Sequence, residues 1–128
     1  MLMNHFILYV SDQARSTAFY TQVLLMEPEL NVPGMTEFRL SAESILGLMP
    51  YTGIERLLGV KVGHAAPVPG AARGELHLIV DDAESHHRRA LDAGARELSP
   101  LSLRDWGDNV AYSLDADGYV LAFASRLK

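Results

Sequence analysis

Apolar and polar positions along the chain follow the same order twice. Residues 3–10 (MNHFILYV) are rich in strand-forming side chains and contain no breaker. They lead into SDQARSTAFYTQVLLM, where apolar residues recur at helical spacing and Ser11 or Asp12 is placed to cap the helix. Three short strands are then predicted, around 28–32, 36–41 and 44–50. The first half of the chain therefore predicts a strand, a helix and three strands.

The second half repeats this order. GELHLIVDD is predicted as a strand, AESHHRRALDAG as a helix that ends at Gly94, and ARELSP as a strand. NVAYSLD and YVLAFAS are two further strands, joined by the turn DADG. The pattern predicts an α+β fold of two βαβββ modules, at 1–50 and 74–128.

The modules are joined by a connector at 51–73 that is rich in Gly, Ala and Pro, which predicts a loop. It is either a passive connection or a mobile flap over a pocket, because loops of this length are often functional. A module of about 60 residues is marginally stable alone. We therefore expect 1–128 to form a single domain, or the modules to exchange partners across a dimer.

Composition narrows the class of partner. The 128 residues are 48% hydrophobic and carry a net charge of -5 without a Lys/Arg cluster, which argues against binding to nucleic acid or to anionic membranes. The absence of cysteine excludes disulfides, thiolate metal sites and cysteine nucleophiles. No signal peptide and no membrane-spanning stretch is expected. These features together favour a cytoplasmic protein.

Three segments carry a family resemblance. SDQARSTAFYTQVL, ELHLIVDDAESHHRRALDAGA and DWGDNVAYSLDADGYVLAF resemble, in this order, the first helix, the second module's strand and helix, and the closing hairpin of the glyoxalase/bleomycin-resistance/extradiol-dioxygenase (vicinal oxygen chelate) superfamily. The resemblance implies curved mixed sheets around a cup that binds small ligands, and it implies that dimers are common. Two residues depart from the family pattern: Leu25 replaces the Gly that usually ends the first helix, and Ala116 replaces the Pro of the closing turn.

The resemblance also implies where a metal would bind. Metal-dependent members use four ligands, two from each module. His5 matches the first ligand, Glu75 stands at the position of the second module's His, and His77 lies two residues further along the same strand face. Gly47 and Ala122 occupy the other two positions and have no donor atom. This favours a cup without a metal or other cofactor, although His5, Glu75 and His77 are a set that suits Zn, Ni, Mn or Fe.

Seven residues are expected to line the cup, because they are predicted to face inward. They are His5, Tyr9, Phe38, Met49, Glu75, His77 and Trp106. All but Glu75 have a structural alternative: a core position for Tyr9, Phe38 and Met49, packing on the sheet edge for Trp106, and hydrogen-bonded polar positions for the two histidines.

Four charged or titratable residues outside this set are expected at the surface. Arg39 and Glu37 share a strand face and are expected to pair with each other or to meet an anionic ligand. His86 and His87 are adjacent on the second helix, so they cannot chelate together and are expected on a solvated face.

Two classes of function follow. The favoured interpretation is a small-molecule-binding protein, a homodimer that sequesters or carries a partly aromatic organic ligand without turnover. The alternative is a metal-dependent enzyme, a glyoxalase-like lyase or isomerase or a dioxygenase, in which His5, Glu75 and His77 hold the metal. Whether the chain is an enzyme stays open, as does a third interpretation, an interaction module without a ligand. Motifs for a nucleophile elbow, a phosphate-binding loop or H-E-x-x-H are absent from the sequence.

Overall fold

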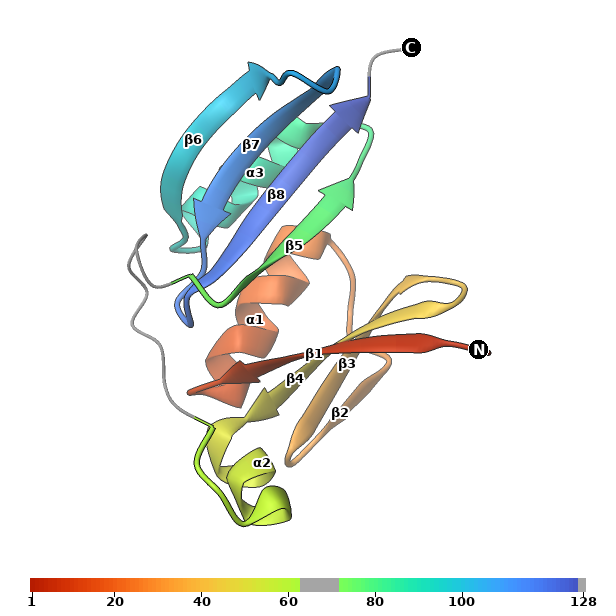
Figure 1. Cartoon of the computed structure of the whole chain (residues 1–128), viewed down its shortest axis with the longest axis vertical. Coiled ribbons are helices and arrows are strands. Elements are labelled where there is room, and N and C mark those ends of the chain that lie inside the picture. The colour runs from red at the N-terminus through yellow and green to blue at the C-terminus, as the bar shows by residue number, and fades with distance from the viewer. Residues whose placement is uncertain (63–71, 127–128) are drawn as a thin grey trace. The chain divides into compact units, whose positions relative to one another are not determined.

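A computed structural model describes residues 1–62 and 72–126, and the order of its elements follows the predicted order closely. The chain divides into two compact units, Met1–His64 and Ala65–Lys128 (Figure 1). The prediction of an α+β fold with two βαβββ modules is confirmed, and each module forms one four-stranded mixed sheet. No helix within 1–62 or 72–126 is long and apolar enough to cross a membrane.

The first unit is a sheet with strand order β1-β4-β3-β2. Its elements are β1 (Asn4–Val10), α1 (Gln13–Leu24), β2 (Leu30–Val32), β3 (Met35–Ser41), β4 (Ser44–Pro50) and α2 (Tyr51–Leu58). β1 runs parallel to β4, whereas β4, β3 and β2 are antiparallel to their neighbours. This arrangement leaves β1 and β2 at the two edges of the sheet.

α1 covers one face of this sheet. The helix begins at Asp12, whose side chain accepts a 3.0 Å hydrogen bond from the backbone N–H of Arg15. Thr17 on the helix shares a buried 2.9 Å hydrogen bond with Thr36 on β3, which identifies the face that the helix covers. The largest fully buried side chains of the unit are apolar or aromatic: Val10, Tyr20, Val23, Phe38, Leu46 and Leu48. Burial of these side chains is the main force that holds α1 on the sheet.

The start of the connector is a helix and not the predicted loop. α2 follows directly after β4, buries Tyr51 and Ile54, and ends at Gly59, which adopts φ 73°. Tyr51 and Ile54 are three residues apart, which places them on one side of a helix. The Gly/Pro density of the rest of the connector outweighed this short signal in the sequence. Residues 63–71 of the connector lie outside the described residues, so the prediction of a flap there stays a prediction.

The second unit repeats the plan with strand order β5-β8-β7-β6. Its elements are β5 (Gly74–Ile79), α3 (Ala83–Asp92), β6 (Arg96–Leu103), β7 (Asp108–Leu114) and β8 (Tyr119–Arg126). β5 is parallel to β8, and β8, β7 and β6 are antiparallel to their neighbours. β6 extends three residues beyond the predicted ARELSP strand, through two register shifts that keep it paired with β7.

α3 packs on one face of this second sheet, as Figure 1 shows behind β7 and β8. The ring of His86 lies against that of Phe123, with centroids 5.3 Å apart. His87 is only 3% exposed, and its Nε2 lies 2.8 Å from Glu97 Oε2 on β6. The prediction that both histidines lie on a solvated face is therefore wrong for His87, which belongs to the contact between helix and sheet.

Candidate functional site

Each sheet has one face turned away from its long helix, and we call this the distal face. Side chains alternate along a strand, so strand register decides which residues share it. On the first sheet Thr36 faces α1, and the neighbouring residues Met35 and Glu37 therefore face the other way. The distal face of the first sheet then comprises His5, Ile7, Tyr9, Met35, Glu37, Arg39, Ile45, Gly47 and Met49.

His5 on this face lies beside a carboxylate that the sequence did not single out as its partner. Its Nδ1 is 3.5 Å from Glu37 Oε2 on β3, although β4 runs between the two strands. Glu37 is paired in register with Gly47, so no side chain of β4 stands between them at that point. Arg39 does not pair with Glu37 as predicted; its Nε lies 2.6 Å from Glu29 Oε2.

A small hollow of about 310 Å³ opens between the His5–Glu37 pair and the Arg39–Glu29 pair. It is lined by Met3, His5, Glu29, Leu30, Glu37, Arg39 and Ile45. The side chains of His5 and Glu37 are 40% and 24% exposed, so both remain within reach of a solute. The hollow combines apolar walls with a hydrogen-bonding imidazole and carboxylate, which suits a small polar organic group.

At Gly47, where the resemblance implies a carboxylate, a residue of the neighbouring strand β1 lies where a side chain would begin. A Cβ built on Gly47 would overlap Cδ1 of Ile7, and it would lie 3.4 Å from Met35 Sδ. Ile7 is the register partner of Gly47 on β1. A side chain at this position would therefore have to displace the end of the apolar Ile7 side chain.

Three more of the predicted lining residues fall in the first unit. Tyr9 and Met49 are register partners on the distal face and are each partly buried, so they are placed to contact a solute there. Phe38 is fully buried at 0% exposure and shares the face of Thr36, which is the face that α1 covers. Phe38 is therefore a core residue of this structure, the alternative that its sequence position allowed.

Glu75 and His77 lie together on the distal face of the second sheet. Their side chains are 43% and 33% exposed, and His77 Nδ1 is 3.0 Å from Glu75 Oε2. Register places His77 beside Ala122 of β8, and Ala122 beside Tyr112 of β7. Ala122 is fully buried and packs with Val110 and Ala124 under Tyr112. His77, Ala122 and Tyr112 therefore lie side by side on this face, across the neighbouring strands β5, β8 and β7.

Trp106 lies outside both sheets, in the turn that joins β6 to β7. It is 58% exposed, and Gly107 after it adopts φ 99° to close the turn. The ring is available to a solute, and as the single tryptophan of the chain it is a natural fluorescent reporter.

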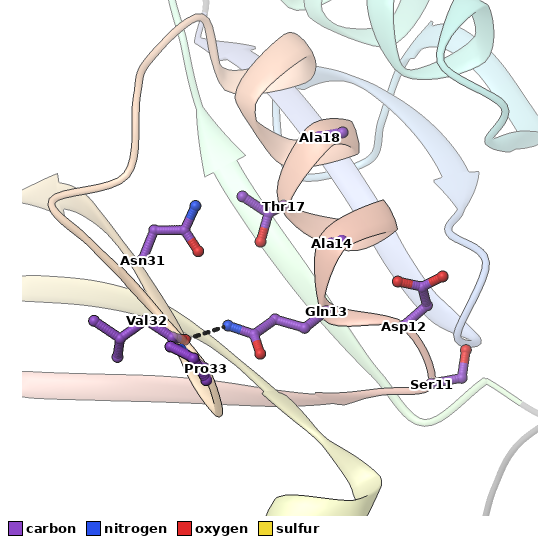
Figure 2. Close-up of a pocket in the computed structure, with 9 residues that line it drawn as sticks. All are labelled: Ser11, Asp12, Gln13, Ala14, Thr17, Ala18, Asn31, Val32 and Pro33. Atoms are coloured by element: carbon purple, nitrogen blue, oxygen red, sulfur yellow. Dashed lines mark hydrogen bonds between the residues drawn. The ribbon is translucent and has the colours of Figure 1, made fainter.

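Two larger hollows lie where α1 and α3 begin. The first, about 800 Å³, is drawn in Figure 2 between α1 and the β2–β3 turn. Its central side chain, Gln13, donates to Val32 O at 2.8 Å and to Thr36 Oγ1 at 3.0 Å, and accepts from Gly34 N–H at 2.9 Å. The second, about 730 Å³, is lined by Ile79, Val80, Asp81, Asp82, His86, Ser125 and Arg126. In the first hollow the polar groups of Gln13 therefore bond to the protein itself.

The donor set does not fit a metal centre inside either unit. Among residues 1–62 and 72–126, no group of three His, Cys, Asp or Glu side chains is arranged to hold an ion. The first unit offers His5 with Glu37, and the second offers Glu75 with His77. Zinc sites in proteins normally have three or four protein ligands, so each of these pairs falls short by itself. The set of His5, Glu75 and His77 draws on both units and stays a prediction.

A fixed arginine is a further candidate that the sequence did not reveal. Arg104, at the end of β6, folds back over Tyr112 with its guanidinium carbon 5.1 Å from the ring centroid. The sequence places Arg104 beside a turn, where most arginines are solvated, and only the pairing of β6 with β7 brings it to Tyr112.

Comparison with known proteins agrees with this architecture. The family model described as Glyoxalase/Bleomycin resistance protein/Dioxygenase superfamily matches residues 2–123, nearly the whole chain. The chain therefore belongs to this superfamily. None of the curated protein sequences matches it closely enough to count as a relative.

Solved structures with the same fold are distant in sequence. A glyoxalase-related enzyme from Fulvimarina pelagi aligns with TM-score 0.82 at 19% identity, over 97% of this chain and 87% of that one. A glyoxalase/bleomycin resistance protein/dioxygenase family enzyme from Burkholderia phytofirmans PsJN aligns with TM-score 0.79 at 17% identity, over 96% and 97%. TioX from Micromonospora sp. ML1 gives 0.66 and 17%, over 98% of both chains. At these identities the likeness shows the fold and not the activity.

Proposed function

We propose that the chain is a small-molecule-binding protein that sequesters or carries an organic ligand, bound on the distal face of a sheet without a metal. The proposal rests on Gly47 and Ala122, the two positions at which the resemblance implies metal-binding carboxylates. Gly47 has no side chain and Ile7 fills its place, while Ala122 is a fully buried methyl in an apolar cluster. The chemistry of the metal-dependent relatives needs an ion as Lewis acid, which these positions do not help to hold.

The distal faces supply what a binding protein needs. In the first unit His5 with Glu37 offers partly exposed hydrogen-bonding groups, and Tyr9 and Met49 offer apolar surface on the same face. In the second unit His77 with Glu75 offers a further hydrogen-bonding pair. Ligand sites in proteins typically combine apolar walls with a few placed polar groups. Trp106 adds an exposed aromatic ring that a flat ligand can contact.

The assembly and location expected from the sequence belong to the same proposal. We expect a homodimer in the cytoplasm, whose mass in sedimentation would be twice the 14.1 kDa of one chain. Support comes from β1, an edge strand that carries Phe6 at 63% exposure and follows three exposed apolar residues, Met1, Leu2 and Met3. Exposed apolar side chains along an unpaired edge are usually covered in an assembly.

The experiment is a thermal-shift screen of flat organic compounds against untagged protein in excess chelator. A ligand that binds only the folded state raises the melting temperature, and binding near Trp106 changes its fluorescence. We expect compounds from the panel to do so equally with and without chelator. Binding that disappears with chelator would contradict the proposal, and so would a broad panel without a single shift.

A further inference from the structure

Arg104 is held in one position on the distal face of the second sheet. Its backbone N–H donates to Asp108 O at 2.8 Å where β6 turns into β7. Its side chain then donates from Nε to Val110 O at 3.2 Å and from Nη2 to Val110 O at 2.7 Å. Nη2 also donates to Ser99 Oγ at 2.9 Å and Pro100 O at 3.1 Å. The guanidinium is thus fixed before any ligand arrives.

Every acceptor that Arg104 uses is neutral. Three are backbone carbonyl or hydroxyl groups, and the fourth contact is the ring of Tyr112. Within the described part of the chain no carboxylate lies within 4.0 Å of Arg104, and the nearby Asp108 faces Arg126 at 3.9 Å. The positive charge is therefore positioned but not neutralised.

One nitrogen of the guanidinium remains available. Nη1 donates to no described atom, and it is not among the fully buried nitrogen and oxygen atoms that lack a partner. Arg104 as a whole is partly buried, so water is only partly able to screen its charge. A hydrogen bond from such a group to an anion is stronger than one between neutral partners.

The side chains around Arg104 add apolar surface. Tyr112 lies against the guanidinium and is partly exposed, and its ring packs on the apolar side chains of Val110, Ala122 and Ala124. Two acidic side chains share this face: Glu75 of β5, which is engaged with His77, and Asp108 of β7, whose carboxylate lies 3.9 Å from Arg126. Two strand spacings, about 10 Å, separate β5 from β7, so Glu75 does not occupy the region of Arg104.

From this geometry we infer that Arg104 and Tyr112 form an anion-recognition site, and that the ligand is an organic anion with a flat apolar body. A carboxylate or phosphate oxygen of the ligand accepts a hydrogen bond from Nη1, and the apolar body lies along Tyr112 and its neighbours. This inference rests on the proposed function, because it names the chemical class of the ligand that the distal face binds.

The test compares ligands that differ in charge alone. Calorimetric titration of the untagged protein with 2-naphthoate, 2-naphthyl phosphate and the neutral 2-naphthamide separates a carboxylate from a phosphate and both from an uncharged ring. We expect at least one anion to bind about tenfold or more tightly than the amide, with an affinity that falls as salt is raised. Equal affinity for all three would overturn the inference and leave the proposed function standing. No binding of any of them would overturn the inference and count against the proposed function.

Two variants test whether Arg104 is responsible for the preference for an anion. Arg104→Gln should remove the preference for the anion, whereas Arg96→Gln should keep it, because Arg96 is an exposed arginine at the other end of β6. A preference that survives in folded Arg104→Gln would overturn the inference.

Loss of the bonds to Val110 could prevent Arg104→Gln from folding, so a measurement on the unchanged protein is needed as well. In ¹⁵N-arginine-labelled protein, with the signal assigned from Arg104→Lys, 2-naphthoate should shift the Nε–H resonance of Arg104 and 2-naphthamide should not. An unmoved Arg104 signal at saturating 2-naphthoate would contradict the site.

Discussion

Leu25 ends α1 with φ 55° and ψ 44°, a left-handed conformation in which its Cβ crowds the following carbonyl. The side chain is 68% exposed, so little packing is lost when it is removed. We expect Leu25→Gly to raise the free energy of unfolding by about 0.5–1 kcal/mol, since glycine adopts this conformation without that crowding. Urea denaturation followed by circular dichroism measures the change.

Gly94 is the matched control for that substitution. It follows α3 with φ 110°, and a Cβ there would meet no atom within 4 Å, so only backbone conformation is tested. Gly94→Ala should lower the free energy of unfolding by about 1 kcal/mol. A lower stability of Leu25→Gly would show that Leu25 makes contacts worth more than the conformational cost.

Gly47 and Ile7 make a second prediction at the residue scale. Because a Cβ at Gly47 would overlap the end of the Ile7 side chain, Gly47→Ala should lower the free energy of unfolding by about 1 kcal/mol. The value is at the low end of overpacking costs, since Ile7 is partly exposed and its end can move. In an Ile7→Val background, which lacks the overlapping methyl, the cost should fall by about half. Equal costs in both backgrounds would mean that Ile7 does not fill the position.

The sequence predicted which residues share a strand face, but it did not predict which residues of other strands they pair with. That Glu37 and Arg39 share a face follows from alternation along the strand, and they do share it. Their partners, His5 and Glu29, come from other strands, and the register that brings them together is decided by packing of the whole sheet. Arg104 was missed for the same reason.

At the scale of elements, the start of α3 gives a prediction of pH dependence. Hydrogen bonds from the Ser85 hydroxyl at 2.7 Å and its backbone N–H at 3.1 Å lower the pKa of Asp82 below its usual 3.8. A pKa that is lower in the folded state means that this cap contributes stability above pH 3.8, and that the contribution is lost as the pH falls through the lower folded value. The melting temperature should therefore decline as the pH is taken below 3.8.

Asp82→Asn isolates that contribution. Asparagine keeps an oxygen that accepts from the Ser85 N–H but does not titrate. The variant should melt below the unchanged protein at neutral pH, and the difference should shrink at pH values below 3.8. A difference that stays constant across this range would show that the charge of Asp82 does not stabilise the helix.

Helices and strands with strong periodicity were predictable, and short or mixed signals were not. The α1 and α3 segments each begin at an aspartate that caps the helix, whereas α2 begins at Pro50 without a side-chain cap and buries only Tyr51 and Ile54. The burial of His87 could have been predicted from its spacing in the sequence. Ala83, His87 and Ala90 are four and three residues apart, and all three lie buried on one side of α3. The polar character of His87 concealed a position that spacing indicated.

At the scale of the whole molecule, the doubled pattern and the order of three segments sufficed to predict the superfamily. The pattern works because each module must bury one sheet face against one helix, which constrains the sequence at every second or every third to fourth position. A ligand site imposes no such period on the sequence. Its residues come from separate segments, as Arg104 and Tyr112 do at the proposed site, and their closeness in space is not expressed along the chain.

Titration of metal ions into the untagged protein tests most directly the claim that the chain binds its ligand without a metal. Zn, Ni, Mn and Fe(II) would each be titrated by calorimetry into the unchanged protein and into His5→Ala. We expect weak binding that does not reach one ion per chain and does not depend on His5, since the positions of Gly47 and Ala122 offer no donor. One tightly bound ion per chain, lost in His5→Ala, would contradict the account and favour a metal-dependent enzyme.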